Sequence, residues 1–197
     1  MKERFLNITI SYITRYQHYN DADIENLRYG LEGLYLTFTK LVLILLLASI
    51  LGIQKQLLIL LVLFNIIRFT GFGFHARTSL ECLVCSTILF VGLPLLFSKL
   101  NLSSDKLLII GLASLIILAI YAPADTVKRP LPNKKKRILR KTSTIVIACT
   151  FIILSYISKN YDLSYLFISA LVLEAIMVSP IMYKIFRQPY KNYKKYN

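Results

Sequence analysis

Long apolar blocks alternate with short polar segments along this 197-residue chain. The runs LVLILLLASILGI (41–53) and LLIIGLASLIILAIYA (107–122) carry no charge, which is typical of membrane spans. The pattern predicts six spans, at about 34–53, 56–70, 80–98, 106–122, 143–158 and 163–183. The second is the weakest, because Arg68 follows its apolar stretch at once. We therefore expect an all-α, polytopic integral membrane protein.

The segment before the first span is more polar. ISYITRY and DADIENLRYGLEGLY suggest one or two short amphipathic helices, the second capped by Asp21 or Asp23. Such a helix either lies on the membrane surface or offers a docking surface for a partner helix. No apolar region followed by a small-residue cleavage site is apparent, so we expect the N-terminus to be retained. The predicted organisation is an amphipathic segment (1–33), a six-helix transmembrane domain (34–183) and a basic tail (184–197).

Composition and charge support a membrane protein. The chain is 56% hydrophobic with a mean hydropathy of +0.59, which is more apolar than a soluble domain of this length. The net charge of +14 would suit nucleic acid, but the basic residues cluster between and after the apolar runs. An anionic inner leaflet attracts residues placed in this way, so we expect membrane lipids as partners and no nucleic acid.

The distribution of Lys and Arg predicts the topology. Nineteen of them fall in the N-terminal segment, the second loop, the fourth loop and the C-terminal tail, whereas the alternate loops hold four. By the positive-inside rule, this asymmetry predicts that both termini and the second and fourth loops lie on the cytoplasmic side of the plasma membrane.

The stretch RFTGFGFHARTSLECLVC (68–85) contains the candidate chemistry. Gly71 and Gly73 favour a break in the chain. T-S-L-E (78–81) matches a capping box, which puts Cys82 at about the fourth position of the next helix. The helix dipole there favours a thiolate. His75 could act as its base only if the chain turns, since residues seven apart on one helix lie about 10 Å apart along its axis.

Other interpretations of this stretch remain open. His75 could be a polar group at the headgroup level, and Cys82 an inert thiol. C-L-V-C (82–85) has metal-ligand spacing, but it lies in an apolar helix, and His18 is remote. A redox role for C-x-x-C is not indicated, because the sequence lacks a thioredoxin-like context. Cys85 and Cys149 are typical of buried core residues. Three cysteines, an odd number, do not suggest a disulfide framework. We expect no metal and no cofactor.

Four ionisable residues lie inside or beside the spans: Glu32, Lys40, Arg68 and Glu174. Such residues are functional candidates, although Glu32 and Lys40 could simply reach the membrane interface. Arg68 could pair with a carboxylate of the protein or bind one of a substrate. Glu174 is the deepest, and we expect it to pair within the helix bundle.

The pattern R-x4-G-x-H-A-x5-C, formed by Arg68, Gly73, His75, Ala76 and Cys82, resembles the AgrB family of accessory gene regulator proteins. The segments Y-G-L-E (29–32) and A-P-A-D-T-V-K-R-P-L (122–131), the six spans and the length also match. The resemblance implies a cysteine endopeptidase of bacterial quorum sensing, embedded in the cell membrane.

In this family the enzyme removes the C-terminal tail of an AgrD-type propeptide, and a thioester intermediate closes to a thiolactone or lactone. The resemblance makes Cys82 the nucleophile and His75 its base, and places Glu32, Arg68 and Gly73 at positions typical of the family. A homodimer is a further expectation from the resemblance alone. The alternative function is a small transporter or channel-like protein that uses Glu174, Arg68 and Lys40 along a pathway.

Overall fold

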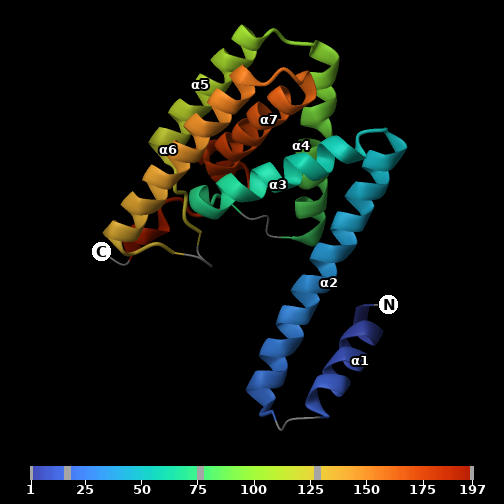
Figure 1. Cartoon of the computed structure of the whole chain (residues 1–197). Coiled ribbons are helices and arrows are strands. Elements are labelled where there is room, and N and C mark those ends of the chain that lie inside the picture. Colours follow the sequence, from blue (N-terminus) through green and yellow to red (C-terminus); the bar gives the residue numbers. More distant parts are fainter. Residues whose placement is uncertain (1, 16–18, 75–77, 127–129, 196–197) are drawn as a thin grey trace. The chain divides into compact units, whose positions relative to one another are not determined.

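A computed structural model describes residues 2–15, 19–74, 78–126 and 130–195, and these residues form helices and no strand (Figure 1). The helices are α1 (Lys2–Thr14), α2 (Asp21–Ile50), α3 (Gln54–Gly71), α4 (Ser79–Leu100), α5 (Ser104–Tyr121), α6 (Lys134–Ile157), α7 (Tyr161–Val178) and α8 (Pro180–Ile185), followed by a 3₁₀ turn (Asn192–Lys195). The predicted all-α class is confirmed.

Helices α2 to α7 are each long and apolar enough to cross a membrane, which confirms the six predicted spans. Three boundaries differ from the prediction. Helix α2 runs unbroken from Asp21, because no residue between the amphipathic segment and the apolar run interrupts it. Helix α6 begins at Lys134, where the side chain of Asn133 caps it by accepting from the N–H of Lys136 at 3.2 Å. Helix α7 ends at Val178, just before Pro180.

The chain divides into two compact units, residues 1–47 and 48–197. In the first unit, α1 packs against the beginning of α2. Lys2 forms an ion pair with Glu32 at 2.6 Å, and Arg28 forms one with Glu3 at 2.5 Å. Leu6 of α1 is fully buried. The N-terminal end of α1 is therefore joined to α2 by charge, and Phe5 packs against Tyr35 of α2 with ring centroids 5.3 Å apart.

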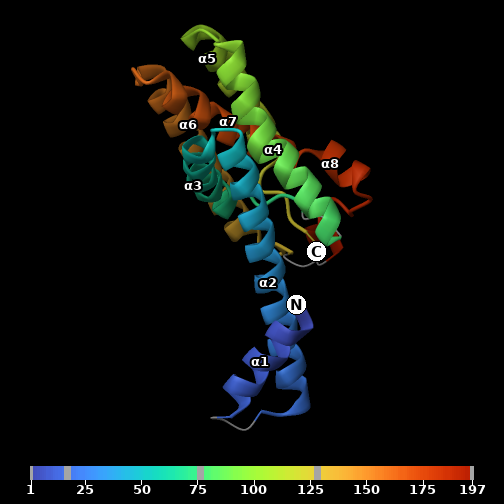
Figure 2. The same cartoon turned by 90° about the vertical axis from the view of Figure 1, so that its right-hand side faces the viewer.

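In the second unit, α7 is the central helix, and α3, α4, α5 and α6 all contact it (Figures 1 and 2). In α7, 72% of the span is buried, compared with 33% or less in every other span. Small residues allow the close approach: a Cβ on Gly111 of α5 would lie only 3.0 Å from Cδ1 of Ile168. The central helix is therefore the element against which the others are placed.

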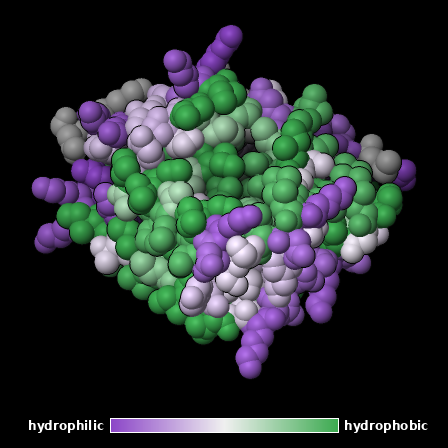
Figure 3. All heavy atoms as spheres, turned by 90° about the horizontal axis from the view of Figure 1, so that it is seen from above, coloured by the Kyte–Doolittle hydropathy of each residue, from purple (hydrophilic) through white to green (hydrophobic). Residues whose placement is uncertain are grey.

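The outward faces of the spans are apolar. Large side chains such as Phe69, Ile116 and Ile153 are more than half exposed. Hydrophobic residues occupy much of the face shown in Figure 3, with hydrophilic residues between them and projecting beyond them. Exposed apolar surface of this extent is expected where lipid, rather than water, surrounds the helices.

Candidate functional site

The segment that follows α3 leaves the helical conformation abruptly. Phe72 has φ of 62° and Gly73 has φ of 108°, both in the left-handed region. The predicted break at Gly71 and Gly73 is therefore confirmed. Without helical partners, the backbone of this segment bonds elsewhere: Gly73 donates to the carbonyl of Ala124 at 2.8 Å, and Phe74 donates to that of Met177 at 3.1 Å. The segment is thus held against residues 122–126 on one side and the end of α7 on the other.

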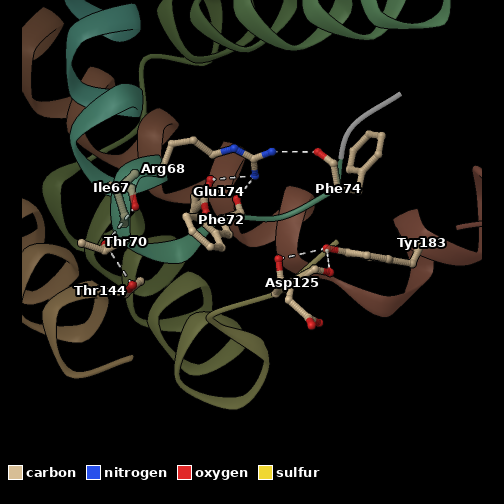
Figure 4. Close-up of polar contacts among 10 residues, drawn as sticks. Ile67, Arg68, Thr70, Phe72, Phe74, Asp125, Thr144, Glu174 and Tyr183 are labelled. Carbon is tan, nitrogen blue, oxygen red and sulfur yellow. Dashed lines mark hydrogen bonds and ion pairs between the residues drawn. The ribbon is translucent and has the colours of Figure 1, made fainter. Parts of the chain in front are cut away.

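Arg68, one turn before the end of α3, lies at the centre of this region (Figure 4). Its Nη2 donates to the carbonyl of Phe74 at 2.7 Å, and its Nη1 donates to that of Phe72. Nη1 also lies 3.5 Å from Oε2 of Glu174, whose side chain is fully buried in α7. The expectation that Glu174 pairs within the bundle is confirmed, and its partner is Arg68. A guanidinium suits this position because its planar fork serves several acceptors at once.

Helix α4 begins as the sequence predicts. Thr78 is its N-cap, and its hydroxyl accepts from the N–H of Glu81 at 3.2 Å, while the Glu81 carboxylate accepts from the N–H of Thr78 at 3.3 Å. Both bonds of the capping box are present. Cys82 is accordingly the fourth residue of the helix, and its side chain is half-buried. Thr78 has an extended backbone, so helix α4 does not continue toward the N-terminus beyond Ser79.

Cys82 and Arg68 line the same cavity, which has a volume of about 260 Å³. Asn65 and Phe74 extend its wall beside Arg68, and Cys85 and Ser86 extend it beside Cys82. The cavity therefore joins the end of α3 to the start of α4, and it presents two thiols, a guanidinium, an amide and a hydroxyl group among apolar side chains. This is a usual composition for a small-molecule or peptide-binding site.

A second cavity, of about 380 Å³, shares Asn65 and Arg68 with the first. Arg140 of α6 faces it together with Asn65 and Thr126. The guanidinium of Arg140 stacks over the ring of Phe72 at 4.2 Å, and its Nη1 donates to the carbonyl of Phe69 at 2.6 Å. This bond satisfies a carbonyl in the last turn of α3. Two guanidinium groups border the cavity, so it favours an anion.

Residues 122–126 connect the site to the C-terminal tail. The hydroxyl of Tyr183 lies 3.1 Å from the carbonyl oxygens of both Ala124 and Asp125, and burial raises the pKa of this tyrosine. The buried carboxylate of Asp125 accepts from the N–H of Tyr193 at 2.6 Å and from that of Asn192 at 3.0 Å. The tail is therefore bonded to the same loop that receives Gly73.

The predicted site residues have different outcomes. Cys82 and Arg68 are brought together at one cavity, and Gly73 lies against Arg68. Glu32 belongs to the N-terminal unit, where its carboxylate accepts from Lys2. His75 lies outside the described residues, as does His18. Among the residues that the structure describes, no cluster of three His, Cys, Asp or Glu side chains could hold a metal ion.

Sequence reasoning missed Arg140 and Asp125 as members of this region. Arg140 was assigned to a basic loop, whereas helix α6 places it beside Phe72. The available signal was its helical spacing from Arg137, which was hidden among lysines. Asp125 lies in the A-P-A-D-T segment that carried part of the family resemblance, but nothing local to that segment indicates that the C-terminal tail bonds to it.

Comparison with known proteins identifies the family. The profile of the family described as accessory gene regulator B matches residues 6–178. A putative AgrB-like protein of Clostridium acetobutylicum is 27% identical over 198 residues, covering 98% of this chain and 93% of that protein. The accessory gene regulator protein B of Staphylococcus epidermidis is 30% identical over 175 residues, covering 87% of this chain and 88% of that protein.

A putative AgrB-like protein of Listeria monocytogenes is 27% identical over 171 residues, covering 86% of this chain and 83% of that protein. No solved structure matches. The agreement extends from α1 to the end of α7, and so includes the residues of the cavity with Cys82 and the position of His75 in the sequence. This chain belongs to the accessory gene regulator B family.

Proposed function

We propose that this protein is a membrane-embedded cysteine endopeptidase that removes the C-terminal tail of an AgrD-type quorum-sensing propeptide and promotes closure of the remaining peptide into a ring. The observation that carries the proposal is the position of Cys82. It lies in the first turns of a capped helix, it lines a cavity with Arg68, and it follows directly on the loop that contains His75. Membership of the family supplies the class of substrate.

The chemistry needs an activated thiol. His75 accepts the proton of the Cys82 thiol, and the thiolate attacks the scissile carbonyl carbon of the propeptide. The C–N bond then breaks, the amine of the departing tail takes the proton from His75, and an acyl-enzyme thioester remains. The first-turn N–H groups of α4 and the positive end of its dipole favour negative charge at this position.

Ring closure is the second acyl transfer. A thiol or hydroxyl group within the bound peptide attacks the thioester carbonyl, which forms a thiolactone or lactone and releases the Cys82 thiolate, and the thiolate recovers its proton. Water competes for the same thioester. Phe64, Phe74 and Phe90 form an apolar wall of the open cavity, and a peptide bound against this wall would limit the access of water to the sulfur and so favour ring closure.

The basic surroundings support an acidic peptide as the substrate. The cavity that Arg140 borders shares Asn65 and Arg68 with the cavity that contains Cys82, so one extended peptide can occupy both. Electrostatic attraction draws an acidic tail toward such a cavity. In the proposed orientation, the two loops that form the site face the cytoplasm, together with both termini.

The test is tail removal in a cell that expresses both this protein and a candidate propeptide. We expect Cys82→Ala and His75→Ala to abolish tail removal while the protein still inserts into the membrane. Cys149→Ala is the matched control, because it removes a thiol outside this cavity and should leave cleavage intact. Mass spectrometry of the product distinguishes a ring from a linear acid, since the ring is lighter by one water.

Two results would overturn the proposal: cleavage that persists in Cys82→Ala, or cleavage that is lost equally in Cys149→Ala. The transporter alternative gives the opposite pattern. It predicts that Cys82→Ser is tolerated and that substitution of the intramembrane charges alone changes transport.

A further inference from the structure

We propose that Glu174 is a positioning residue that acts through Arg68 and fixes the direction in which the backbone enters the segment with His75. This inference rests on the proposed function for its consequence in catalysis. Glu174 is fully buried in α7, and it does not line the cavity that contains Cys82. It therefore does not touch a bound peptide, and its effect has to pass through another side chain.

Arg68 is the side chain through which it acts (Figure 4). Its guanidinium lies between the carboxylate of Glu174, at 3.5 Å, and the carbonyl oxygens of Phe72 and Phe74. An arginine side chain has several rotatable bonds, so its head needs a fixed counter-charge to keep one position. Glu174 provides that charge. The N–H groups of Arg68 are then directed at the carbonyl oxygens of Phe72 and Phe74 and donate to them.

The carboxylate of Glu174 is itself held in place. It packs against Gly71, the last residue of α3, so closely that a Cβ at position 71 would overlap with Oε1. Oε1 has no hydrogen-bond partner among the described residues. A buried carboxylate with one charged partner contributes little to stability compared with an apolar residue of its size. Its presence in the central helix is better explained by what it does to Arg68.

The effect of Glu174 on Arg68 is passed on through Phe74, the residue immediately before His75. Helix α7 fixes both of its peptide groups. Its N–H donates to the carbonyl of Met177 at 3.1 Å, and its carbonyl accepts from Arg68, which Glu174 holds from one turn earlier on the same helix. If the pair with Glu174 is lost, the carbonyl side of Phe74 is released, and the N–H bonds of residues 72–74 open more often as a result.

The experiment uses the full chain in detergent micelles and has two readouts. The first is hydrogen exchange at the backbone amides of residues 72–74, which does not depend on activity. The second is kcat and KM for tail removal from a synthetic propeptide. For Glu174→Ala we expect at least about tenfold faster exchange at residues 72–74. We also expect a fall in kcat on the order of 100-fold, with KM changed by about twofold or less. Glu174→Asp should recover part of the loss, because it restores the charge.

Ser169→Ala is the matched control. Ser169 is another fully buried polar residue of α7, and its Oγ has no hydrogen-bond partner among the described residues. Its loss should leave exchange and kcat unchanged. A double-mutant cycle gives the sharper result: in an Arg68→Ala background, Glu174→Ala should cause no further fall in kcat, because the residue through which it acts is gone.

Wild-type exchange at residues 72–74 in Glu174→Ala would overturn the inference, and so would additive losses in the double variant. If Arg68→Ala does not insert, the comparison of Glu174→Gln with Glu174→Asp still decides, since only the second restores the counter-charge. Failure of the proposed function gives a different result, namely a wild-type protein that removes no tail while Glu174→Ala still speeds exchange at residues 72–74.

Discussion

The backbone N–H of Gly73 lies 2.8 Å from the carbonyl oxygen of Ala124, and this hydrogen bond joins two loops that are far apart in the chain. Ala124 returns a bond of 3.0 Å to the carbonyl of Gly71. The pair of bonds forms a single bridge outside any strand. It holds the loop that leads to His75 against the loop that receives the C-terminal tail. Changes in the conformation of this loop should therefore alter the site that contains Cys82.

Gly73→Ala tests that relationship. The residue has φ of 108°, and a Cβ there would overlap with Arg68 Nη1 and lie 2.8 Å from the carbonyl oxygen of Met177. We expect tail removal to be lost, because the guanidinium must move away. Gly52→Ala is the matched control: Gly52 also has a positive φ, of 71°, but its Cβ would meet nothing within 4 Å. Gly52→Ala should lower the free energy of unfolding only by the cost of placing an alanine in a left-handed conformation, about 1–2 kcal/mol. Equal loss of tail removal in both variants would contradict the idea that the contact between position 73 and the Arg68 guanidinium is the cause.

Thr78→Ala should loosen the first turn of α4 and with it the position of Cys82. Loss of an N-cap hydroxyl costs about 1 kcal/mol, so we expect tail removal to fall several-fold without complete loss. Thr78→Ser should retain activity, because it keeps the hydroxyl that accepts from Glu81. Ser103→Ala is the control, since Ser103 precedes α5 without a side-chain capping bond. Thermal unfolding and initial rates of cleavage provide the measurement. An equal effect of Ser103→Ala would show that the cap is not the cause.

Arg140→Gln tests whether the second cavity binds the acidic part of the substrate. Removing this charge should raise KM several-fold for a propeptide with an acidic tail and leave kcat nearly unchanged. The difference should shrink at high salt and disappear for a propeptide whose acidic residues are replaced by amides. Lys141→Gln removes the same charge from the next position, outside this cavity, and should leave KM near the wild-type value. A uniform rise in KM with both variants would indicate general attraction by the basic surface instead.

The contact between α1 and α2 should depend on pH. The hydrogen bond from Arg28 lowers the pKa of Glu3 below its ordinary value, so this bond stabilises the contact above that value and is lost as the pH falls through the lowered pKa. The hydrogen bond to Glu32 raises the pKa of Lys2, so the contribution of the Lys2 charge is lost as the pH rises through the raised pKa.

A pair of spin labels on α1 and on the first half of α2 can follow this contact. We expect the narrowest distance distribution between the two transitions, and a broader one in acid, in strong base and at high salt. Glu3→Gln should weaken the acid transition, because the pair with Arg28 is gone, and leave the transition in base in place. A distribution that stays the same across the pH range would contradict the part played by these ion pairs.

The spans and the helix start at Cys82 could be predicted because their causes are local. An apolar run of about 20 residues has to form a helix in lipid to satisfy its own backbone, whatever its neighbours are. The capping box at Thr78 needs only residues 78–81. The break after α3 likewise follows from Gly71 and Gly73. The residues at which α2 and α6 begin were harder to predict, because amphipathic and basic residues can belong to a helix as readily as to the segment before it.

The sequence by itself determined the membrane class, the number of spans and the helical position of Cys82. Only the tertiary structure decided which side chains meet. It paired Arg68 with Glu174, which lies 106 positions later, and it placed Arg140 beside Phe72 and the C-terminal tail on Asp125. The physical reason is that these contacts depend on which faces of the helices turn toward α7. That choice is made by packing between distant segments, and no short window of the sequence records it.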